Sequence, residues 1–181
     1  MIRARLSGFP SLSAALVSTL FAVSGCGGDG ASEETPASGG GIQICDLLTD
    51  EEVSTALPNH DEGFVASSGG SLMEGVDTYQ CSYSAQEGER YDLMTVIVTV
   101  GSDPEQFEDW IRPSRSSKEA YGNFRELEIT DGGFLYGEPE DMKVDVWEGT
   151  TLISLNLMAP GAESRSGALV ELASRIVAKL D

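Results

Sequence analysis

Apart from its carboxylates, this chain has few residues that could do chemistry: three cysteines and one histidine among 181 residues. The histidine, His60, lies in the polar stretch PNHDEG. A Ser–His–Asp triad would have to use it, yet the sequence has no G-x-S-x-G elbow and no H-E-x-x-H pattern. Zinc is held mainly by histidine and thiolate ligands, so a chain with a single histidine offers a poor set of zinc ligands. We therefore expect His60 to be exposed in a loop, without a catalytic or metal-binding role.

The carboxylates are abundant: thirty Asp and Glu residues oppose eleven Lys and Arg residues, a formal net charge of −19. Phosphate recognition needs a basic patch, so this balance excludes nucleic acid as a partner. Two carboxyl groups about 5–10 Å apart could hydrolyse a glycosidic bond, which keeps a hydrolase open as an alternative. The stretch DGGFLYGEPED, residues 131–141, could hold calcium but lacks the alternating ligands of an EF-hand loop. Because any carboxylate pair could be chosen here, we assign no catalytic, cofactor-binding or metal-binding residue.

The remaining candidate for chemistry is Cys26, which directly follows the end of an apolar run. Arg3 and Arg5 precede a dense apolar segment, residues 14–23, which is short for a membrane-spanning helix of about 20 residues. It has the length of the apolar core of a signal peptide. The tetrapeptide VSGC, residues 23–26, resembles the lipobox of bacterial lipoproteins, with an aliphatic residue, two small residues and a cysteine.

The lipobox resemblance implies a signal peptide over residues 1–25 and a diacylglycerol thioether on Cys26. In that family the new amino terminus is often acylated too, for example with palmitate. One acyl chain gives only marginal membrane binding, whereas two or three hold a protein stably. The chain is therefore expected to be exported and anchored to the cell membrane or the outer membrane. An ordinary secretory peptide and an uncleaved anchor are the alternatives.

A tether follows the anchor. Residues 26–41 are rich in glycine, serine and acidic side chains and carry no large aliphatic or aromatic residue. Such a segment cannot bury enough apolar surface to offset the entropy of ordering it. We expect a flexible linker with a reach of roughly 20 Å, followed by one globular domain over residues 42–181.

With Cys26 used for lipid, Cys45 and Cys81 can form only one intramolecular pair. In an exported chain the expected product is a disulfide. It would close a loop of roughly 36 residues and stabilise the fold by about 3.8 kcal/mol on the loop-entropy estimate. The alternative is a thiol pair with catalytic or metal-binding work, which neither a C-x-x-C motif nor a nearby histidine supports.

Periodicity predicts an α+β domain. Capping signals and 3.6-residue spacing predict three helices: residues 50–57, 103–112 with Phe107, Trp110 and Ile111 on one face, and 169–180. Alternation predicts strands at 63–67, 78–84, 92–101 and 124–129, and a hairpin over 142–158 that turns at Gly149–Thr150. In the hairpin, the residues expected to face the core are Val144, Val146, Ile153, Leu155 and Leu157. The order α-βββ-α-βββ-α indicates an antiparallel sheet with helices packed on one face.

Three short motifs in the domain support a second resemblance. CDLLTDEEV at residues 45–53, QCSY at 80–83 and ALVELASRIVAKL at 168–180 are similar to segments of small bacterial lipoproteins with a domain of unknown function. The step before the last hairpin, residues 131–141, departs from that family's glycine–acid–alanine pattern. The resemblance implies an envelope location, a compact α+β domain and the same cysteine pair. It implies no activity and supplies no catalytic residue.

Together these features predict a membrane-anchored, non-enzymatic binding or accessory module at the cell envelope, without a cofactor. Its partner would be a small molecule, an envelope polymer or a membrane protein. Aromatic side chains on the sheet are the candidate ligand face: Tyr83, Tyr136 and Trp147. The alternative is an envelope hydrolase that uses paired carboxylates.

Overall fold

The computed structural model describes residues 41–70 and 73–180, which fall within one compact unit. The predicted signal peptide, Cys26 and all of the predicted tether except Gly41 lie outside the described residues. None of the helices in the described ranges has the length and hydropathy needed to cross a bilayer.

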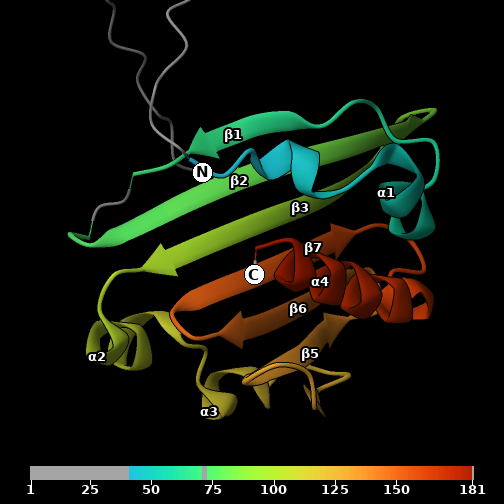
Figure 1. Ribbon diagram of the computed structural model, residues 1–181. Helices are drawn as coiled ribbons and strands as arrows, with labels where there is room; N and C mark the ends of the chain where they lie inside the picture. The colour runs from blue at the N-terminus through green and yellow to red at the C-terminus, as the bar shows by residue number, and fades with distance from the viewer. Residues whose placement is uncertain (1–40, 71–72, 181) are drawn as a thin grey trace, which may run out of the picture. The chain divides into compact units, whose positions relative to one another are not determined.

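An antiparallel sheet forms the centre of the described domain (Figure 1). Its seven strands lie in the order β1-β2-β3-β7-β6-β5-β4. Their bounds are β1 Phe64–Ser68, β2 Val76–Glu87, β3 Arg90–Gly101, β4 Arg125–Leu127, β5 Gly132–Glu138, β6 Asp141–Glu148 and β7 Thr151–Met158. Strand β7 therefore joins the two hairpins β2–β3 and β5–β6 by pairing with β3 on one side and β6 on the other.

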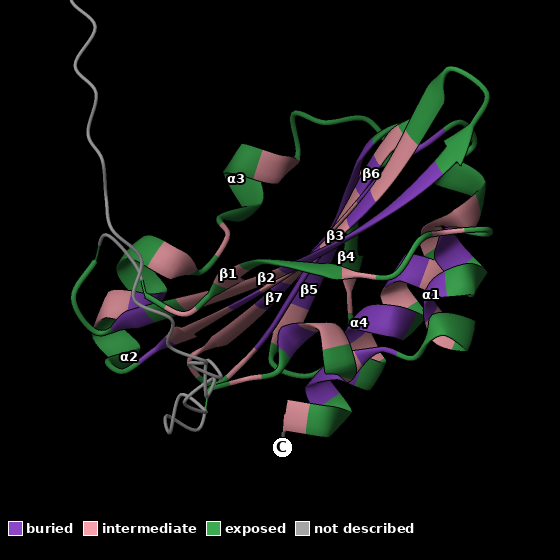
Figure 2. Cartoon of the chain, turned by 90° about the horizontal axis from the view of Figure 1, so that it is seen from above, coloured by how far each residue is buried: buried purple, intermediate pink, exposed green. Residues whose placement is uncertain are grey.

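The helices and the antiparallel sheet confirm the predicted α+β class, and the two longest helices pack on one face as predicted. Helix α1 (Asp50–Ala56) and the long helix α4 (Ser166–Leu180) cover one face, and α4 contacts β6 and β7. The short segments α2 (Pro104–Gln106), η2 (Phe107–Ile111) and α3 (Arg115–Lys118) connect β3 to β4. Figure 2 shows α3 on the opposite side of the sheet from α1 and α4. The remaining helical turns are η1 (Ile44–Leu47) and η3 (Glu163–Arg165).

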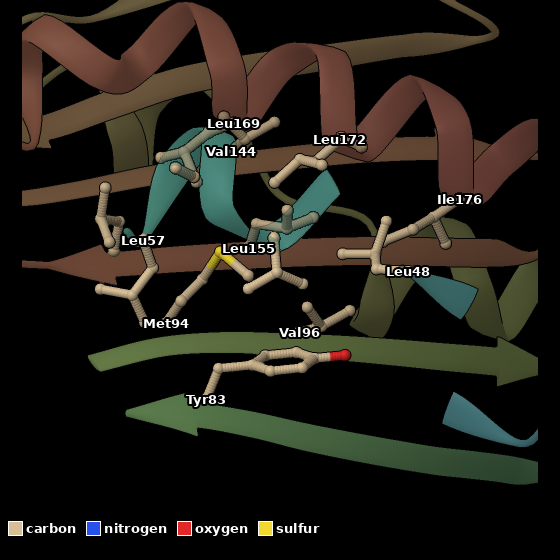
Figure 3. Close-up of a cluster of buried hydrophobic side chains, with 14 of the residues drawn as sticks. Leu48, Leu57, Tyr83, Met94, Val96, Val144, Leu155, Leu169, Leu172 and Ile176 are labelled. Atoms are coloured by element: carbon tan, nitrogen blue, oxygen red, sulfur yellow. The ribbon is translucent and has the colours of Figure 1, made fainter. Parts of the chain in front are cut away.

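The main core lies between the sheet and the pair α1 and α4. The stripe on α4 meets β3, β6 and β7 through Leu169, Leu172 and Ile176 (Figure 3). The five hairpin residues predicted to point inward are all buried: Val144, Val146, Ile153, Leu155 and Leu157. Alternation along the strands and the 3.6-residue stripe on the helix therefore located this core correctly.

One strand was missing from the prediction. Residues 131–141, for which the sequence predicts no strand, contain β5, in which Phe134, Leu135 and Tyr136 are all buried. The strand is covered on both faces, because Leu135 belongs to the main core and its two neighbours belong to a second apolar cluster. Three glycines flank the apolar run and leave only three apolar residues in a row, which hid the strand signal. The second group thus has four strands instead of three.

The second predicted helix also differs. After the cap by Asp103, the backbone forms one short α-turn and then the π-helical turn η2, in which Arg112 N–H donates to Phe107 O at 2.8 Å. A π-turn is wider than an α-turn, so residues three apart no longer share a face. Phe107 is buried, whereas Trp110 is 75% exposed. The expectation that Phe107, Trp110 and Ile111 share one buried face was wrong for Trp110.

The disulfide Cys45–Cys81 is confirmed and joins η1 to β2 with a Cα–Cα distance of 5.3 Å. A hydrogen bond from Tyr83 Oη to Cys45 O, 3.1 Å long, reinforces this link. Gly63 leaves room beside it, since a Cβ there would lie 2.5 Å from the Tyr83 ring and 2.9 Å from Cys81 Sγ. The segment that leads from the amino-terminal side into the domain is thus fixed to the sheet twice.

Removing the disulfide should loosen this segment. We expect the Cys45→Ala/Cys81→Ala variant to unfold with a free energy lower by about 3–4 kcal/mol, since the unfolded chain regains the entropy of a 36-residue loop. Guanidinium unfolding of the variant and of the oxidised wild type measures the difference. A change below about 1 kcal/mol would show that the Tyr83 hydrogen bond and core packing suffice.

Glu52 joins α1 to α4. It completes the predicted capping box, since Thr49 N–H donates to Glu52 Oε2 at 2.8 Å and Glu52 N–H donates to Thr49 Oγ1 at 3.3 Å. Arg175 and Lys179 of α4 also donate to its carboxylate, at 3.2 and 3.1 Å. The backbone N–H of Thr49 is the main cause that lowers the pKa of Glu52 to about 2, and the two cations add to it.

This carboxylate should make the fold sensitive to acid. Because its folded-state pKa of about 2 is below the ordinary 4.5, its contribution is present above pH 4.5 and is lost as the pH falls towards 2. We expect Glu52→Gln to cost about 1–2 kcal/mol at pH 7, discounted for solvent screening, and almost nothing at pH 2. Urea unfolding of both proteins across this range measures it. If the difference in unfolding free energy between the two proteins does not change with pH, the ionised Glu52 carboxylate is not its cause.

Candidate functional site

The three aromatic residues proposed as a ligand face do not share a face. Tyr83 is 2% exposed and lies in the main core, on the side covered by α1 and α4. Tyr136 and Trp147 are 5% and 4% exposed and lie in the second cluster, on the opposite face of the sheet. An exposed aromatic patch built from these rings is therefore absent from the described domain.

His60 was also placed wrongly as an exposed residue. Its side chain is 5% exposed, and its ring meets Tyr83 edge-on with centroids 5.8 Å apart. The Nδ1 atom lies 3.0 Å from Leu57 O. Burial raises the pKa of Tyr83 to about 12, and the nearby carboxylates of Asp50 and Asp46 add to this shift. His60 and Tyr83 thus contribute to the packing around the disulfide and leave no reactive group exposed.

The second cluster covers β5 and β6 on the face turned away from α4, which we call the second face. It consists of Phe107, Phe134, Tyr136 and Trp147. Trp147 lies in the space left by Gly132, where a Cβ would approach the indole to 2.5 Å. The guanidinium carbon of Arg112 lies 5.0 Å from the centre of the same indole. Aromatic packing therefore fixes the connection between η2 and α3 against the sheet.

A buried polar network adjoins this cluster. Asp145 lies between Val144 and Val146 in β6, so its side chain points to the second face. Its Oδ1 accepts a hydrogen bond from Ser154 Oγ at 2.7 Å, and its Oδ2 accepts one from Tyr136 Oη at 2.9 Å. The residue is only 4% exposed, and a buried carboxylate is costly without such donors.

Lys118 completes the network from α3. Its Nζ lies 3.2 Å from Asp145 Oδ2 and donates to Tyr136 Oη at 2.7 Å. Burial, followed by the charge of Asp145, raises the pKa of Tyr136 well above its ordinary value. A phenol with a raised pKa is a poor acid, and both carboxylate oxygens of Asp145 are already occupied by hydrogen bonds from Tyr136 and Ser154. The arrangement favours a rigid wall over proton transfer.

A cavity of about 420 Å³ opens beside the network. Its polar floor comes from β6 and β7, and its apolar edge comes from η2. We call it the second-face cavity; its principal lining residues are Trp110, Ile111, Lys118, Lys143, Ser154 and Asn156. The volume lies in the range of about 300–1,000 Å³ that is usual for small-ligand sites. Trp110 is mostly exposed, so its indole is accessible at this edge.

The floor of the cavity contains an unmet acceptor. Asn156 Oδ1 is buried and has no hydrogen-bond partner among the described residues. Asn156 pairs in register with Lys143 of β6, whose Nζ lies 3.1 Å from Asp141 Oδ2. An unpaired buried acceptor costs about 1–3 kcal/mol. Because this oxygen has almost no accessible surface, a ligand in the cavity cannot reach it in this conformation.

A neighbouring cavity of about 460 Å³ lies on the other side of Arg112 and Pro113. Its polar groups are exposed ion pairs, Arg112 with Glu108 at 2.6 Å and Arg115 with Glu126 at 2.8 Å. These groups satisfy one another and are open to solvent, where ion pairs contribute little. Across the described ranges, no group of three or more His, Cys, Asp or Glu side chains could hold a metal ion.

Comparisons with known proteins identify no relative: no family model, no curated protein and no solved structure matches this chain. The site must therefore be judged on its own geometry. Sequence reasoning named Tyr136 and Trp147 but missed the polar residues around them. The signal was the outward-pointing set in MKVDVWEG, Lys143, Asp145 and Trp147, because a tryptophan there indicates a covered face.

The network predicts unequal roles for the two lysines in the cavity. Lys118→Met should lower the free energy of unfolding by about 2–3 kcal/mol, because it leaves the buried Asp145 carboxylate without its cation. Lys143→Met should cost less than about 1 kcal/mol, since its partner Asp141 is 39% exposed. Chemical unfolding at pH 7 measures both. Equal losses would contradict the assignment of Asp145 as the buried charge on which this face depends.

Proposed function

We propose that this chain is a non-enzymatic binding module that holds a ligand in the second-face cavity. One observation carries the proposal: a cavity of small-ligand size combines a rigid polar floor with an exposed indole at its edge. Both walls are fixed in the absence of ligand, the floor by the Asp145 network and the edge by Phe107 packing. A pre-formed site loses little entropy when a ligand binds.

The proposed location is the cell envelope. The lipobox-like VSGC supports export, cleavage after residue 25 and lipid attachment at Cys26. The tether, residues 26–41, would place the domain near the lipid surface of the cell membrane or outer membrane. The disulfide Cys45–Cys81 agrees with an oxidising compartment outside the cytoplasm. The partners are thus the membrane, through the anchor, and an envelope small molecule, polymer or protein, through the cavity.

Two mass spectra of the chain extracted gently from its own membranes test this proposal. The denatured spectrum should give the mass of acylated Cys26–Asp181 less two hydrogens, for the anchor and the disulfide. The native spectrum should show additional mass from the bound ligand. A denatured chain that still begins at Met1 without lipid would refute the anchor.

Two neighbouring serines on α3 provide a matched pair of variants. Ser117 lines the second-face cavity, whereas Ser116 does not, and both are exposed. We expect Ser117→Trp to fill the cavity and abolish the additional native mass, while Ser116→Trp retains it. Additional mass that persists in Ser117→Trp would place the ligand elsewhere. Cleavage of an envelope polysaccharide by the purified wild type would instead support the hydrolase alternative.

A further inference from the structure

The charges around the second-face cavity cancel in pairs. Each of its three cations has a carboxylate partner: Lys118 with Asp145 at 3.2 Å, Lys143 with Asp141 at 3.1 Å and Arg112 with Glu108 at 2.6 Å. The chain as a whole carries −19, which repels anions from a distance. A cation, in turn, would meet two ammonium groups inside the cavity. The electrostatics therefore favour a ligand without net charge.

The wall of the cavity offers a ligand both a hydrogen-bond donor and a hydrogen-bond acceptor. An ammonium group has three N–H donors, and Lys118 directs two at Tyr136 and Asp145, which leaves one for a ligand acceptor. The Ser117 hydroxyl at the wall can also accept. Hydroxyl groups do both, since each has one O–H donor and two lone pairs.

The edge of the cavity is aromatic and flat. Trp110 is 75% exposed and lines the cavity beside Ile111 and Pro113, so its indole can cover an apolar ligand surface. A sugar ring has such a surface in its C–H groups, while its hydroxyls project from the rim. The indole would contact the ring face, and the hydroxyls would reach the polar floor.

We infer that the second-face cavity binds an uncharged sugar unit, which stacks on Trp110 and exchanges hydroxyl hydrogen bonds with Lys118 and Ser117. This inference rests on the proposed binding function and names the ligand class for the same site. The cavity is open at the Trp110 edge, so the unit can be a free sugar or one residue of a longer envelope glycan. A charged uronic acid of the same ring size would bring an uncompensated carboxylate to a neutral site.

Calorimetric titration of the full-length chain in detergent tests the ligand class. The probes are neutral N-acetylhexosamine and hexose oligosaccharides of one to four units, with uronic acid oligomers of matched length. We expect the neutral oligosaccharides to bind and the uronic acid oligomers to bind at least tenfold more weakly. Affinity that rises with oligomer length would identify a glycan as the ligand, and equal affinity for the monosaccharide would identify a free sugar. Equal binding of charged and neutral oligomers would overturn the inference.

Two aromatic variants locate the sugar. Trp110→Ala should weaken binding at least tenfold with little effect on stability, because its side chain is mostly exposed. Phe64→Ala removes an aromatic that is 55% exposed on β1, three strands from β7, and should leave the affinity unchanged. Because Trp147 is buried, Trp110 is the accessible tryptophan of the described domain. Bound sugar should therefore also protect the fluorescence of Trp110 from quenching by acrylamide. Unchanged affinity in Trp110→Ala would overturn the stacking geometry.

The saccharide titration and the native mass spectrum together distinguish failure of the sugar inference from failure of the proposed binding function. If none of the saccharides binds, yet the native mass spectrum shows a ligand that Ser117→Trp loses, the site is right and the sugar class is wrong. If the saccharides fail and the native spectrum shows no ligand, both proposals fail.

Discussion

The second face of the sheet depends on one buried carboxylate. Asp145 lies on the interior strand β6, where the opposite face of the sheet is already buried under α4, so its charge cannot reach water by a small shift. It needs donors, and these come from β5 (Tyr136), β7 (Ser154) and α3 (Lys118). Because Lys118 must stay within reach, α3 is held on the sheet, and the chain from η2 to α3 has to cross above β6 and β7. The second-face cavity lies below this crossing.

The two faces of the sheet illustrate two ways of covering strands. The long helix α4 covers its face with a continuous apolar stripe that packs into the main core. The second face is covered by short segments, each of one or two turns, that touch the sheet through single side chains such as Phe107 and Lys118. Coverage by separate contacts leaves space between them, and polar groups of the sheet remain accessible there. A ligand site is therefore expected on the second face.

The features that depend on local periodicity or on the number of cysteines could be predicted from the sequence. Alternation located β6, β7 and their inward residues, the apolar stripe located α4, and two cysteines allowed one pair. Sequence reasoning missed β5, whose glycines leave only a short apolar run, and His60, whose burial depends on the distant Tyr83. The cavity depends on register, since Asp145 pairs with Ser154 and Lys143 with Asn156 across strands β6 and β7. The predicted Gly149–Thr150 turn fixes that register. No local pattern, however, places η2 and α3 over these strands, so the cavity itself could not be predicted.

The π-helical turn η2 links the fold to the site. An α-helical turn would place Trp110 on the same face as Phe107, directed at the second cluster, and the indole would cover the sheet itself. The wider turn keeps Phe107 as the anchor and rotates Trp110 outward, so a large apolar ring is left in water. Stability alone would favour burying it, since an aromatic ring gains free energy when it leaves water. Such turns often occur at functional sites, and here the exposed ring borders the second-face cavity. The backbone irregularity and the polar floor of the cavity are thus two independent observations that support the proposed ligand site.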